Sequence, residues 1–457
     1  MKQSIESTNG FESYTEAVNW VTGLVAEKGM RPGLKRMEWL MKKLGHPERR
    51  LKFIHVAGTN GKGSTCAFLT NVLLRNGYDV GTFTSPYMTK FTDRLRYNGK
   101  DIEEEQLLAL ANEIKPLAEE LARTELGHPT MFEVTTTIAI LYFAKVVFPD
   151  YVVWEVGMGG RLDSTNVVLP VISIITNIGH DHKEFLGETL EEIAAEKAGI
   201  IKPGVPVVTT VEQPEALAVI ERISAKHHSS LYRLGQEFSY EPISAELHRH
   251  IFTFESPFRR MKELQISLNG HHQFKNASAA LMAIEVLRQY QALIIEEEDL
   301  YSALKDTFWP GRLELAGEQP QLLLDGAHNP EGAASLANAL TTLYSYDRLH
   351  IMLGMISGKE HEAYLRQLVP LAHTLIITEP DFHKKYAAAD LAYTAQEIVR
   401  ELGSEVEIRV ERDWRKAMEA LQQMTGPGQL ALVTGTLYLI SDVRARLGGQ
   451  AQNEKGW

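Results

Sequence analysis

The sequence predicts an α/β protein with a large first domain, a small antiparallel insert within it, and a smaller Rossmann-like second domain. Short apolar runs alternate with helical stretches between residues 51 and 210. Two strand-like runs, I-F-T-F and L-Q-I-S-L, follow each other between residues 231 and 268 without a helix between them. The α/β alternation restarts after Trp309-Pro310-Gly311. Strands alternating with helices are typical of parallel sheets, whereas consecutive short strands favour an antiparallel one.

The expected elements follow in chain order. The first strand, 51–57, runs into a Gly-rich loop and a helix through Phe68, Leu69, Val72 and Leu73. Apolar runs predict further strands at 80–84, 151–156, 171–176 and 205–210, and in the second domain at 321–325, 349–353, 374–378, 407–410 and 430–434. We therefore expect a first domain over 1–308, a second domain over 309–446 and a flexible tail over 447–457.

Composition limits the possible functions. The chain has 457 residues, 44% of them apolar, and a formal net charge of −12. An acidic chain argues against a broad nucleic-acid surface, which needs a basic stripe. The single cysteine, Cys66, suits a reducing compartment. The first residues have no apolar signal-peptide core, and no run of about 18 apolar residues predicts a membrane span. We expect a cytoplasmic, monomeric protein without a nucleic-acid or membrane partner.

The most specific motif is Ala57-Gly58-Thr59-Asn60-Gly61-Lys62-Gly63-Ser64, between an expected strand and an expected helix. A phosphate loop requires this context, because its glycines let backbone N–H groups approach phosphate oxygens at the helix start. In that role Lys62 would reach the β- and γ-phosphates, and Ser64 would offer a hydroxyl to Mg²⁺. The string departs from G-x-x-x-x-G-K-[ST], because Val56 stands at the first glycine position and Gly63 precedes the serine.

Glu155 and Lys197 are further candidate residues for the same site. Glu155 ends an expected strand, as the acid that accompanies a phosphate loop does; a solvated strand end is the alternative. A capping box at Thr189-Leu190-Glu191-Glu192 predicts a helix that places Lys197 on one face with Leu190, Ile193 and Ile201. Burial lowers the pKa of a lysine from ~10.4, and a neutral amine can take up CO₂ as a carbamate that supports Mg²⁺. A snorkelling lysine is the alternative.

Several other stretches agree in order and context with one known family. They are T-S-P at 84–86, G-M-G-G-R-L-D-S-T-N at 157–166, I-G-H-D-H at 178–182, E-K-A-G-I-I-K at 196–202 and D-G-A-H-N-P at 325–330. Together with G-T-N-G-K-G-S at 58–64, they resemble the folylpolyglutamate synthase/dihydrofolate synthase family of the Mur ligase superfamily. The resemblance covers nearly the whole chain.

This resemblance implies a P-loop Mur-ligase-type ATPase domain and an ATP-dependent amide ligase. The expected reaction adds L-glutamate to the γ-carboxylate of (tetrahydro)folate through an acyl phosphate, and also joins glutamate to dihydropteroate. The resemblance implies that Mg²⁺ is held by Ser64, Glu155 and His182, and that Lys197 is carbamylated. It assigns nucleotide binding to Thr59, Asn60, Gly61, Lys62, Gly63, Ser64, Thr65, Asn276, Arg312 and Asp325.

The resemblance also suggests where the substrates lie. The loop Ser85-Pro86-Tyr87 would shape the folate pocket, although the family often has histidine where Tyr87 stands. Asp325 and His328 would face the junction of ATP and glutamate, with His328 holding or deprotonating the incoming amine. The expected catalytic residues are therefore Lys62, Lys197, Asp325 and His328.

Some assignments stay open at this stage. Glu133 lies at an expected helix start, where it would either serve the helix dipole alone or support metal or substrate. Asp181 is expected to orient His182, and His180 receives no role. Two other functions are possible: a Mur-type ligase that acts on a peptidoglycan precursor, and a nucleotide-binding regulatory protein without ligase chemistry.

Overall fold

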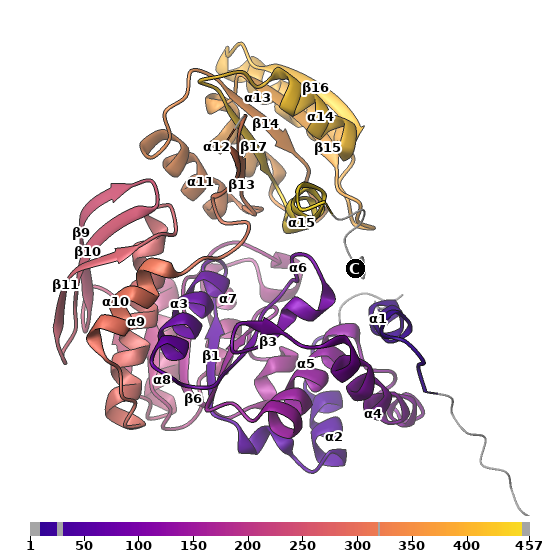
Figure 1. Cartoon of the computed structure of the whole chain (residues 1–457), viewed down its shortest axis with the longest axis vertical. Helices are drawn as coiled ribbons and strands as arrows, with labels where there is room; N and C mark the ends of the chain where they lie inside the picture. Colours follow the sequence, from indigo (N-terminus) through magenta and orange to yellow (C-terminus); the bar gives the residue numbers. More distant parts are fainter. Residues whose placement is uncertain (1–9, 25–30, 319, 450–457) are drawn as a thin grey trace, which may run out of the picture.

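The computed structural model describes residues 10–24, 31–318 and 320–449. Figure 1 shows two lobes joined near residue 310, with the second lobe in orange to yellow above the first. The first lobe contains an eight-stranded sheet and a three-stranded sheet, and the second contains a six-stranded sheet. This arrangement confirms the predicted α/β fold class.

The eight-stranded sheet has the order β4-β3-β2-β5-β1-β6-β7-β8. Its strands pair in parallel, except for the β2–β3 and β3–β4 pairs, which are antiparallel. The strands are β1 (Phe53–Ala57), β2 (Val80–Phe83), β3 (Leu95–Tyr97), β4 (Lys100–Asp101), β5 (Tyr151–Glu155), β6 (Pro170–Ile175), β7 (Val207–Thr209) and β8 (Leu231–Arg233). Each of the five strands predicted in this sheet is present, and the short strands β3, β4 and β8 at its two ends were not predicted.

Both faces of this sheet are buried, which explains why apolar residues of β1 point to both faces. Ile54 and Val56 enter a core with α3 (Lys62–Arg75), α9 (His272–Tyr290) and α10 (Glu297–Asp306), whereas Phe53 enters a core on the other face. That second core contains residues of α1 (Tyr14–Gly23), α2 (Lys35–Lys43), α4 (Glu104–Ala122) and α5 (Met131–Leu141). Helices α6 (Lys183–Leu186), α7 (Leu190–Lys197) and α8 (Pro214–Lys226) complete the lobe.

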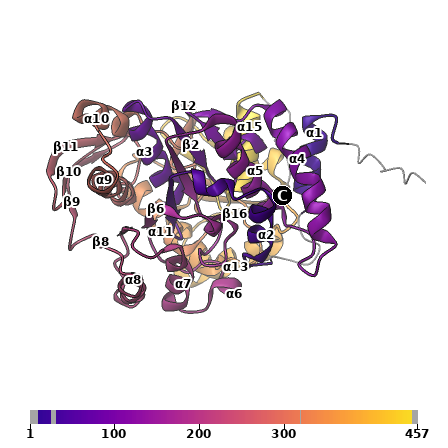
Figure 2. The same ribbon diagram turned by 90° about the horizontal axis from the view of Figure 1, so that it is seen from below.

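The antiparallel insert is present but begins later than predicted. It consists of β9 (Ser239–Glu246), β10 (Arg249–Glu255) and β11 (Arg260–Ile266), in the order β11-β10-β9. Residues 231–233 instead form β8, which pairs in parallel with β7 because helix α8 connects the two as a crossover. Figure 2 shows the insert at the opposite end of the first lobe from α1 and α4.

The second lobe has the strand order β12-β13-β17-β14-β15-β16, with only β12 antiparallel. Its strands are β12 (Glu314–Glu318), β13 (Gln321–Leu324), β14 (Leu349–Leu353), β15 (Thr374–Glu379), β16 (Glu407–Asp413) and β17 (Leu430–Thr434). Its helices are α11 (Pro330–Thr342), α12 (His361–Leu368), α13 (Ala388–Leu402), α14 (Trp414–Met424) and α15 (Leu437–Leu447). We propose residue 309 as the domain boundary, because it lies between α10, which ends at Asp306, and β12, the first strand of the six-stranded sheet.

Two expectations concern the ends and the membrane. Helix α15 runs to Leu447, and residues 450–457 of the expected tail lie outside the described residues. Among the helices that the structure describes, none is long and apolar enough to cross a membrane.

Candidate active site

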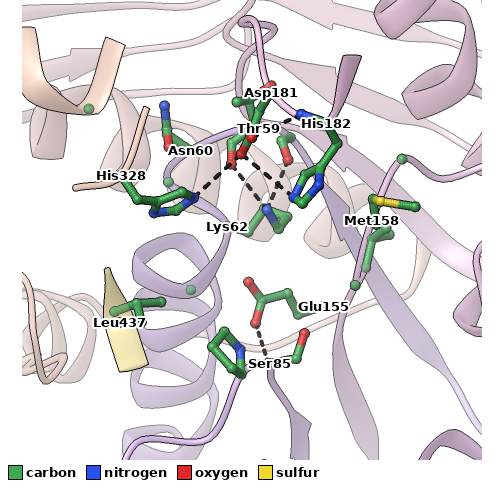
Figure 3. A pocket seen from close by; sticks show the side chains of 18 of the residues that line it. Thr59, Asn60, Lys62, Ser85, Glu155, Met158, Asp181, His182, His328 and Leu437 are labelled. Carbon is green, nitrogen blue, oxygen red and sulfur yellow. Dashed lines mark hydrogen bonds and ion pairs between the residues drawn. The ribbon is translucent and has the colours of Figure 1, made fainter. Parts of the chain in front are cut away.

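A cavity of about 1220 Å³ lies between the two lobes. The first lobe contributes the phosphate loop after β1 and the loops that follow β2, β5 and β6. The second lobe contributes the loop after β13, the β14–α12 loop and the start of α15. The carboxyl ends of parallel strands therefore face one another across the cavity, at the position where α/β proteins bind ligands. Figure 3 shows the side chains that meet there.

The phosphate loop has the geometry that the motif predicts. Strand β1 ends at Ala57 and α3 begins at Lys62, with Gly61 between them at φ +83°. A side chain at Gly61 would collide with the amide of Asn276, so only glycine fits there. The Lys62 ammonium donates hydrogen bonds to Gly58 O (2.9 Å) and Thr59 O (3.2 Å). The lysine is thus curled over its own loop, inside the cavity (Figure 3).

The residues that follow in α3 differ in exposure to the cavity. Gly63 and Ser64 line it, and the Ser64 hydroxyl accepts a weak hydrogen bond from Gln273 Nε2 (3.4 Å). Asn276 also lines the cavity and donates to Gln273 Oε1 (2.9 Å). Thr65 is fully buried and is not part of the lining. The structure therefore brings the predicted loop residues and Asn276 together, and leaves Thr65 behind them.

Glu155 is a buried acid at the end of β5. Burial raises the pKa of its carboxyl, and the nearby charges of Lys62, Arg312 and Arg94 together with the Ser85 N–H act in the opposite direction. Ser85 N donates to Glu155 Oε2 at 2.9 Å, so the loop after β2 is fixed to this carboxylate. The carboxylate is therefore not the solvated strand end of the alternative interpretation.

The predicted folate loop is divided between cavity and core. Ser85 and Pro86 line the cavity, whereas Tyr87 is 1% exposed and packs in the core against Phe91. The structure therefore does not place Tyr87 where a substrate would touch it. Arg94 lines the cavity instead and lies over the Tyr87 ring.

Lys197 ends α7 and is 4% exposed at the cavity wall. The capping box at Thr189 and Glu192 starts this helix as predicted. Burial, followed by the charge of Lys62, lowers the pKa of the Lys197 ammonium to about 7. The predicted direction of this pKa shift agrees with the structure. Lys197 is not the snorkelling surface lysine of the alternative interpretation. Helix α7 ends at Lys197, so Ile201 lies beyond the helix rather than on its face.

Asp181 lies between the loop that carries His182 and the loop that carries His328. Its Oδ2 lies 3.8 Å from His182 Nε2 and 3.4 Å from His328 Nε2, and its Oδ1 lies 2.5 Å from Lys359 Nζ. Burial alone would raise the pKa of this carboxyl, but the hydrogen bond and charge of His328, with Lys359 and His182, lower it overall. Burial lowers the pKa of His182 to about 3, so its ring is neutral near pH 7. Asp181 therefore contacts His182, as expected, and also the second lobe.

The second lobe presents Arg312, Asp325 and His328 to the cavity. Burial raises the pKa of the Asp325 carboxyl, with the charge of Arg312 as the largest opposing effect. Asp325 accepts hydrogen bonds from Leu313 N (3.0 Å) and Ala327 N (2.9 Å). His328 Nδ1 lies 2.9 Å from Gly326 O, which can only accept, so this nitrogen carries the proton. The other ring nitrogen, Nε2, therefore faces Asp181.

Glu133 has a structural position outside the cavity lining. It is the N3 residue of the capping box that starts α5, where it accepts a hydrogen bond from Thr130 N (2.7 Å). Its carboxylate also forms a buried ion pair with Arg36 at 2.9 Å. The structure thus supports the helix-start interpretation.

Sequence reasoning missed several side chains of the site. Asn60 and Asn329 exchange two amide hydrogen bonds (3.1 and 3.0 Å) between the phosphate loop and the cap of α11. Lys359 and Arg94 are buried cations on the lining, and Glu331 accepts a hydrogen bond from His180 N (2.9 Å). Asn329 stands in the D-G-A-H-N-P stretch, which was a usable signal. Arg94 stands in K-F-T-D-R-L at 90–95, the stretch after the folate loop that departs from the family pattern, whereas Lys359 stands in no motif that sequence reasoning singled out.

Comparison with known proteins decides the family. The Mur ligase middle domain model matches residues 56–284, and the Mur ligase glutamate ligase domain model matches residues 311–437. The dihydrofolate synthase/folylpolyglutamate synthase of Bacillus subtilis is 42% identical over 96% of this chain and 100% of its own length. The chain belongs to this folylpolyglutamate synthase/dihydrofolate synthase family.

Solved structures of the same family have the same fold. The folylpolyglutamate synthase of Thermotoga maritima is 33% identical with a TM-score of 0.82, over 97% of this chain and 98% of that one. Mycobacterium tuberculosis folylpolyglutamate synthase complexed with ADP is 26% identical with a TM-score of 0.87, over 95% of this chain and 99% of that one. These comparisons confirm the predicted family and the predicted Mur-ligase-type fold.

Proposed function

We propose that this protein joins L-glutamate both to the γ-carboxylate of a folate and to dihydropteroate. It is an ATP-dependent ligase of the folylpolyglutamate synthase/dihydrofolate synthase family. The observation that carries the proposal is that the phosphate loop around Lys62 lines the same cavity as Asp325 and His328. The name of the Bacillus subtilis relative, which covers both activities, supports the second acceptor. A regulatory protein without ligase chemistry would not need the amine-side groups of the second lobe.

The reaction would proceed in two steps. A carboxylate is a poor electrophile, so ATP would first phosphorylate it to an acyl phosphate and release ADP. The α-amine of glutamate would then attack the carbonyl carbon, the bond to the phosphate oxygen would break, and the nitrogen would lose a proton to a base. Lys62 would neutralise charge on the transferred phosphoryl group from the first lobe, and Arg312 from the second.

The residues present fit Mg²⁺ bound together with nucleotide. Ser64 offers a hydroxyl, Glu155 a buried carboxylate and His182 a neutral ring nitrogen. Among the described residues, no three His, Cys, Asp or Glu side chains form a metal site by themselves. Mg²⁺ suits such a site, because it takes few protein ligands and completes its shell with phosphate oxygens and water. When bound, it would neutralise charge on those oxygens.

Lys197 suits carbamylation in two respects. Its amine has a pKa of about 7, so a large share of it is neutral at physiological pH and can react with CO₂. After burial, the charge of Lys62 is the next cause that lowers this pKa. A negative carbamate would convert that repulsion into an attraction and would add an anion near His182.

His328 is the proposed base for the amine. A proton taken up at its Nε2 would face Asp181 Oδ2 at 3.4 Å. The Nδ1–H bond to Gly326 O holds the ring in this orientation, as a second hydrogen bond does for catalytic histidines elsewhere. Asp325 would hold the loop that carries His328 through its bond to Ala327 N and would face the nucleotide.

The acceptor would bind where the cavity is apolar. Its wall there comprises Met131, Phe132, Met158, Leu162 and Phe185, beside Ser85 and Pro86. A few polar groups in an apolar wall suit an aromatic acceptor such as a pteridine with its benzoyl group. This pocket also separates the proposal from a ligase for a peptidoglycan precursor, whose sugar nucleotide is far more polar.

The residues assigned above to nucleotide, metal and amine all come from one chain, in keeping with the proposed monomer. Cys66, buried and free, suits a reducing cytoplasm.

The test is a side-by-side assay of ADP release with dihydropteroate, tetrahydrofolate and a UDP-muramoyl peptide, each with and without L-glutamate. We expect glutamate-dependent ADP release and a glutamylated product with both pteridine acceptors. Turnover with the muramoyl compound alone would favour the peptidoglycan ligase. ADP release that ignores both glutamate and acceptor would favour a regulatory ATPase.

A further inference from the structure

The ion pair between Asp181 and Lys359 joins the two lobes inside the cavity. Lys359 Nζ lies 2.5 Å from Asp181 Oδ1, and the side chains are 5% and 9% exposed. Among described residues, three other ion pairs cross between the lobes: His180–Glu331, Lys183–Glu360 and His328–Asp181. The Asp181–Lys359 pair is the least exposed of the four. A buried ion pair is sensitive to the loss of either partner, because the remaining charge is then desolvated and unpaired.

The backbone holds Lys359 at this point. It lies in the loop between β14 and α12, at the carboxyl end of a central strand of the second sheet. Ser357 N donates to Lys384 O (2.8 Å), and His361 N donates to Lys359 O (3.0 Å). The ammonium is therefore presented to the first lobe from a supported loop.

The pair also fixes the orientation of Asp181. Lys359 occupies Oδ1, which also accepts a hydrogen bond from His182 N (2.9 Å). The other oxygen, Oδ2, is thereby directed to the rings of His182 and His328, which lie on different lobes. Loss of the ammonium would free the carboxylate to rotate and would weaken the closed arrangement around both rings.

We propose that Lys359 is a positioning residue that keeps the lobes closed on Asp181, so that glutamate rather than water captures the acyl phosphate. The inference rests on the proposed function and adds to it a residue that controls how much of the acyl phosphate becomes amide rather than being lost to water. Attack by the amine forms the amide and releases phosphate, whereas attack by water returns the carboxylate and releases phosphate. ADP is formed on either route, so the ratio of ADP to amide measures the escape of intermediate to water.

The experiment measures ADP and glutamylated product together for the wild type, K359M, K359R and E360Q, at saturating MgATP, tetrahydrofolate and glutamate. We expect about one ADP per amide in the wild type. K359M should show at least three ADP per amide and an amide-forming kcat lowered ~10²-fold, the cost of a ~1 Å misplacement. Its KM for ATP should change less than threefold. K359R, which keeps the charge, should lie closer to the wild type than K359M.

E360Q is the matched control, because it removes the neighbouring and more exposed contact between the lobes, Lys183–Glu360 at 2.8 Å. It should keep the wild-type ratio. K359Q is measured as well, so that poor folding of K359M does not decide the outcome. A wild-type ratio in folded K359M or K359Q would overturn the inference, as would an equal rise in E360Q. Failure of the proposed function would be distinguishable, because the wild type itself would then form no amide.

Discussion

At the scale of single residues, Lys197 shows a conflict between stability and function. A lysine side chain at 4% exposure is costly as a cation, and a second lysine nearby lowers its pKa further, to about 7. An ordinary structural position would favour an apolar residue. The conflict is resolved if the amine leaves the cationic state, which is what carbamate formation does.

The pH dependence of activity follows from this shift. The amine is protonated below a pH of about 7 and cannot react with CO₂, whereas above that pH it is mostly neutral. At constant dissolved CO₂, the rate of glutamate-dependent ADP release should fall at least about tenfold between pH 8 and pH 6, because the amine becomes protonated and carbamate formation itself releases a proton. At pH 7, removal of CO₂ should abolish the rate, and bicarbonate should restore it.

The variant K197A is the control for that profile. It should lose activity ~10³-fold, and a short carboxylic acid such as acetate should partly restore it by replacing the missing anion. The restored rate should not depend on CO₂. A wild-type rate that is unchanged by CO₂ removal across this range would rule out the carbamate.

At the scale of elements, helix α3 is flanked by two glycines of similar conformation, one of which lies in the nucleotide site. Gly61 precedes the helix at φ +83°, and Gly77 follows it at φ +79°. An alanine side chain at Gly61 would collide with Asn276, whereas one at Gly77 would meet nothing within 4 Å. Alanine substitutions at the two positions therefore distinguish the conformational cost of a positive φ from interference with the nucleotide site.

G77A should lower the stability of the protein by about 1 kcal/mol and leave nucleotide binding unchanged. G61A should carry the same cost and in addition weaken binding of a non-hydrolysable ATP analogue at least tenfold. Thermal unfolding and calorimetric titration of both variants measure the two effects. Equal affinity in G61A and G77A would contradict the assignment of the phosphate loop.

Elements with a strong local pattern were predictable from the sequence. The strand around Phe53–Ala57, the Gly-rich loop and α3 follow from local periodicity and turn chemistry alone. The short strands β3, β4 and β8 do not, because two or three residues carry no periodicity and depend on a neighbouring strand for their hydrogen bonds. The prediction that Tyr87 lines the pocket was wrong for a related reason. The motif locates the loop, but packing in the core determines which side chain of the loop is buried.

At the scale of the whole molecule, several contacts between the lobes lie at the active-site cavity, and others join Met88 and Thr89 to α15. Asn60 pairs with Asn329, and Asp181 pairs with Lys359 and His328. Asp181 and Lys359 are 178 positions apart, and a single sequence has no signal that would pair them. Motifs thus predicted the groups that each lobe supplies, whereas their alignment across the cavity needed the three-dimensional structure.

The central claim is that a nucleotide held by the first lobe activates a carboxylate that an amine held by the second lobe then captures. The most direct measurement uses tetrahydrofolate labelled with ¹⁸O in its γ-carboxylate, with MgATP and L-glutamate. An acyl phosphate leaves one carboxylate oxygen on the phosphate, so we predict one ¹⁸O in the inorganic phosphate for each amide formed. Amide formation with unlabelled phosphate would contradict the account.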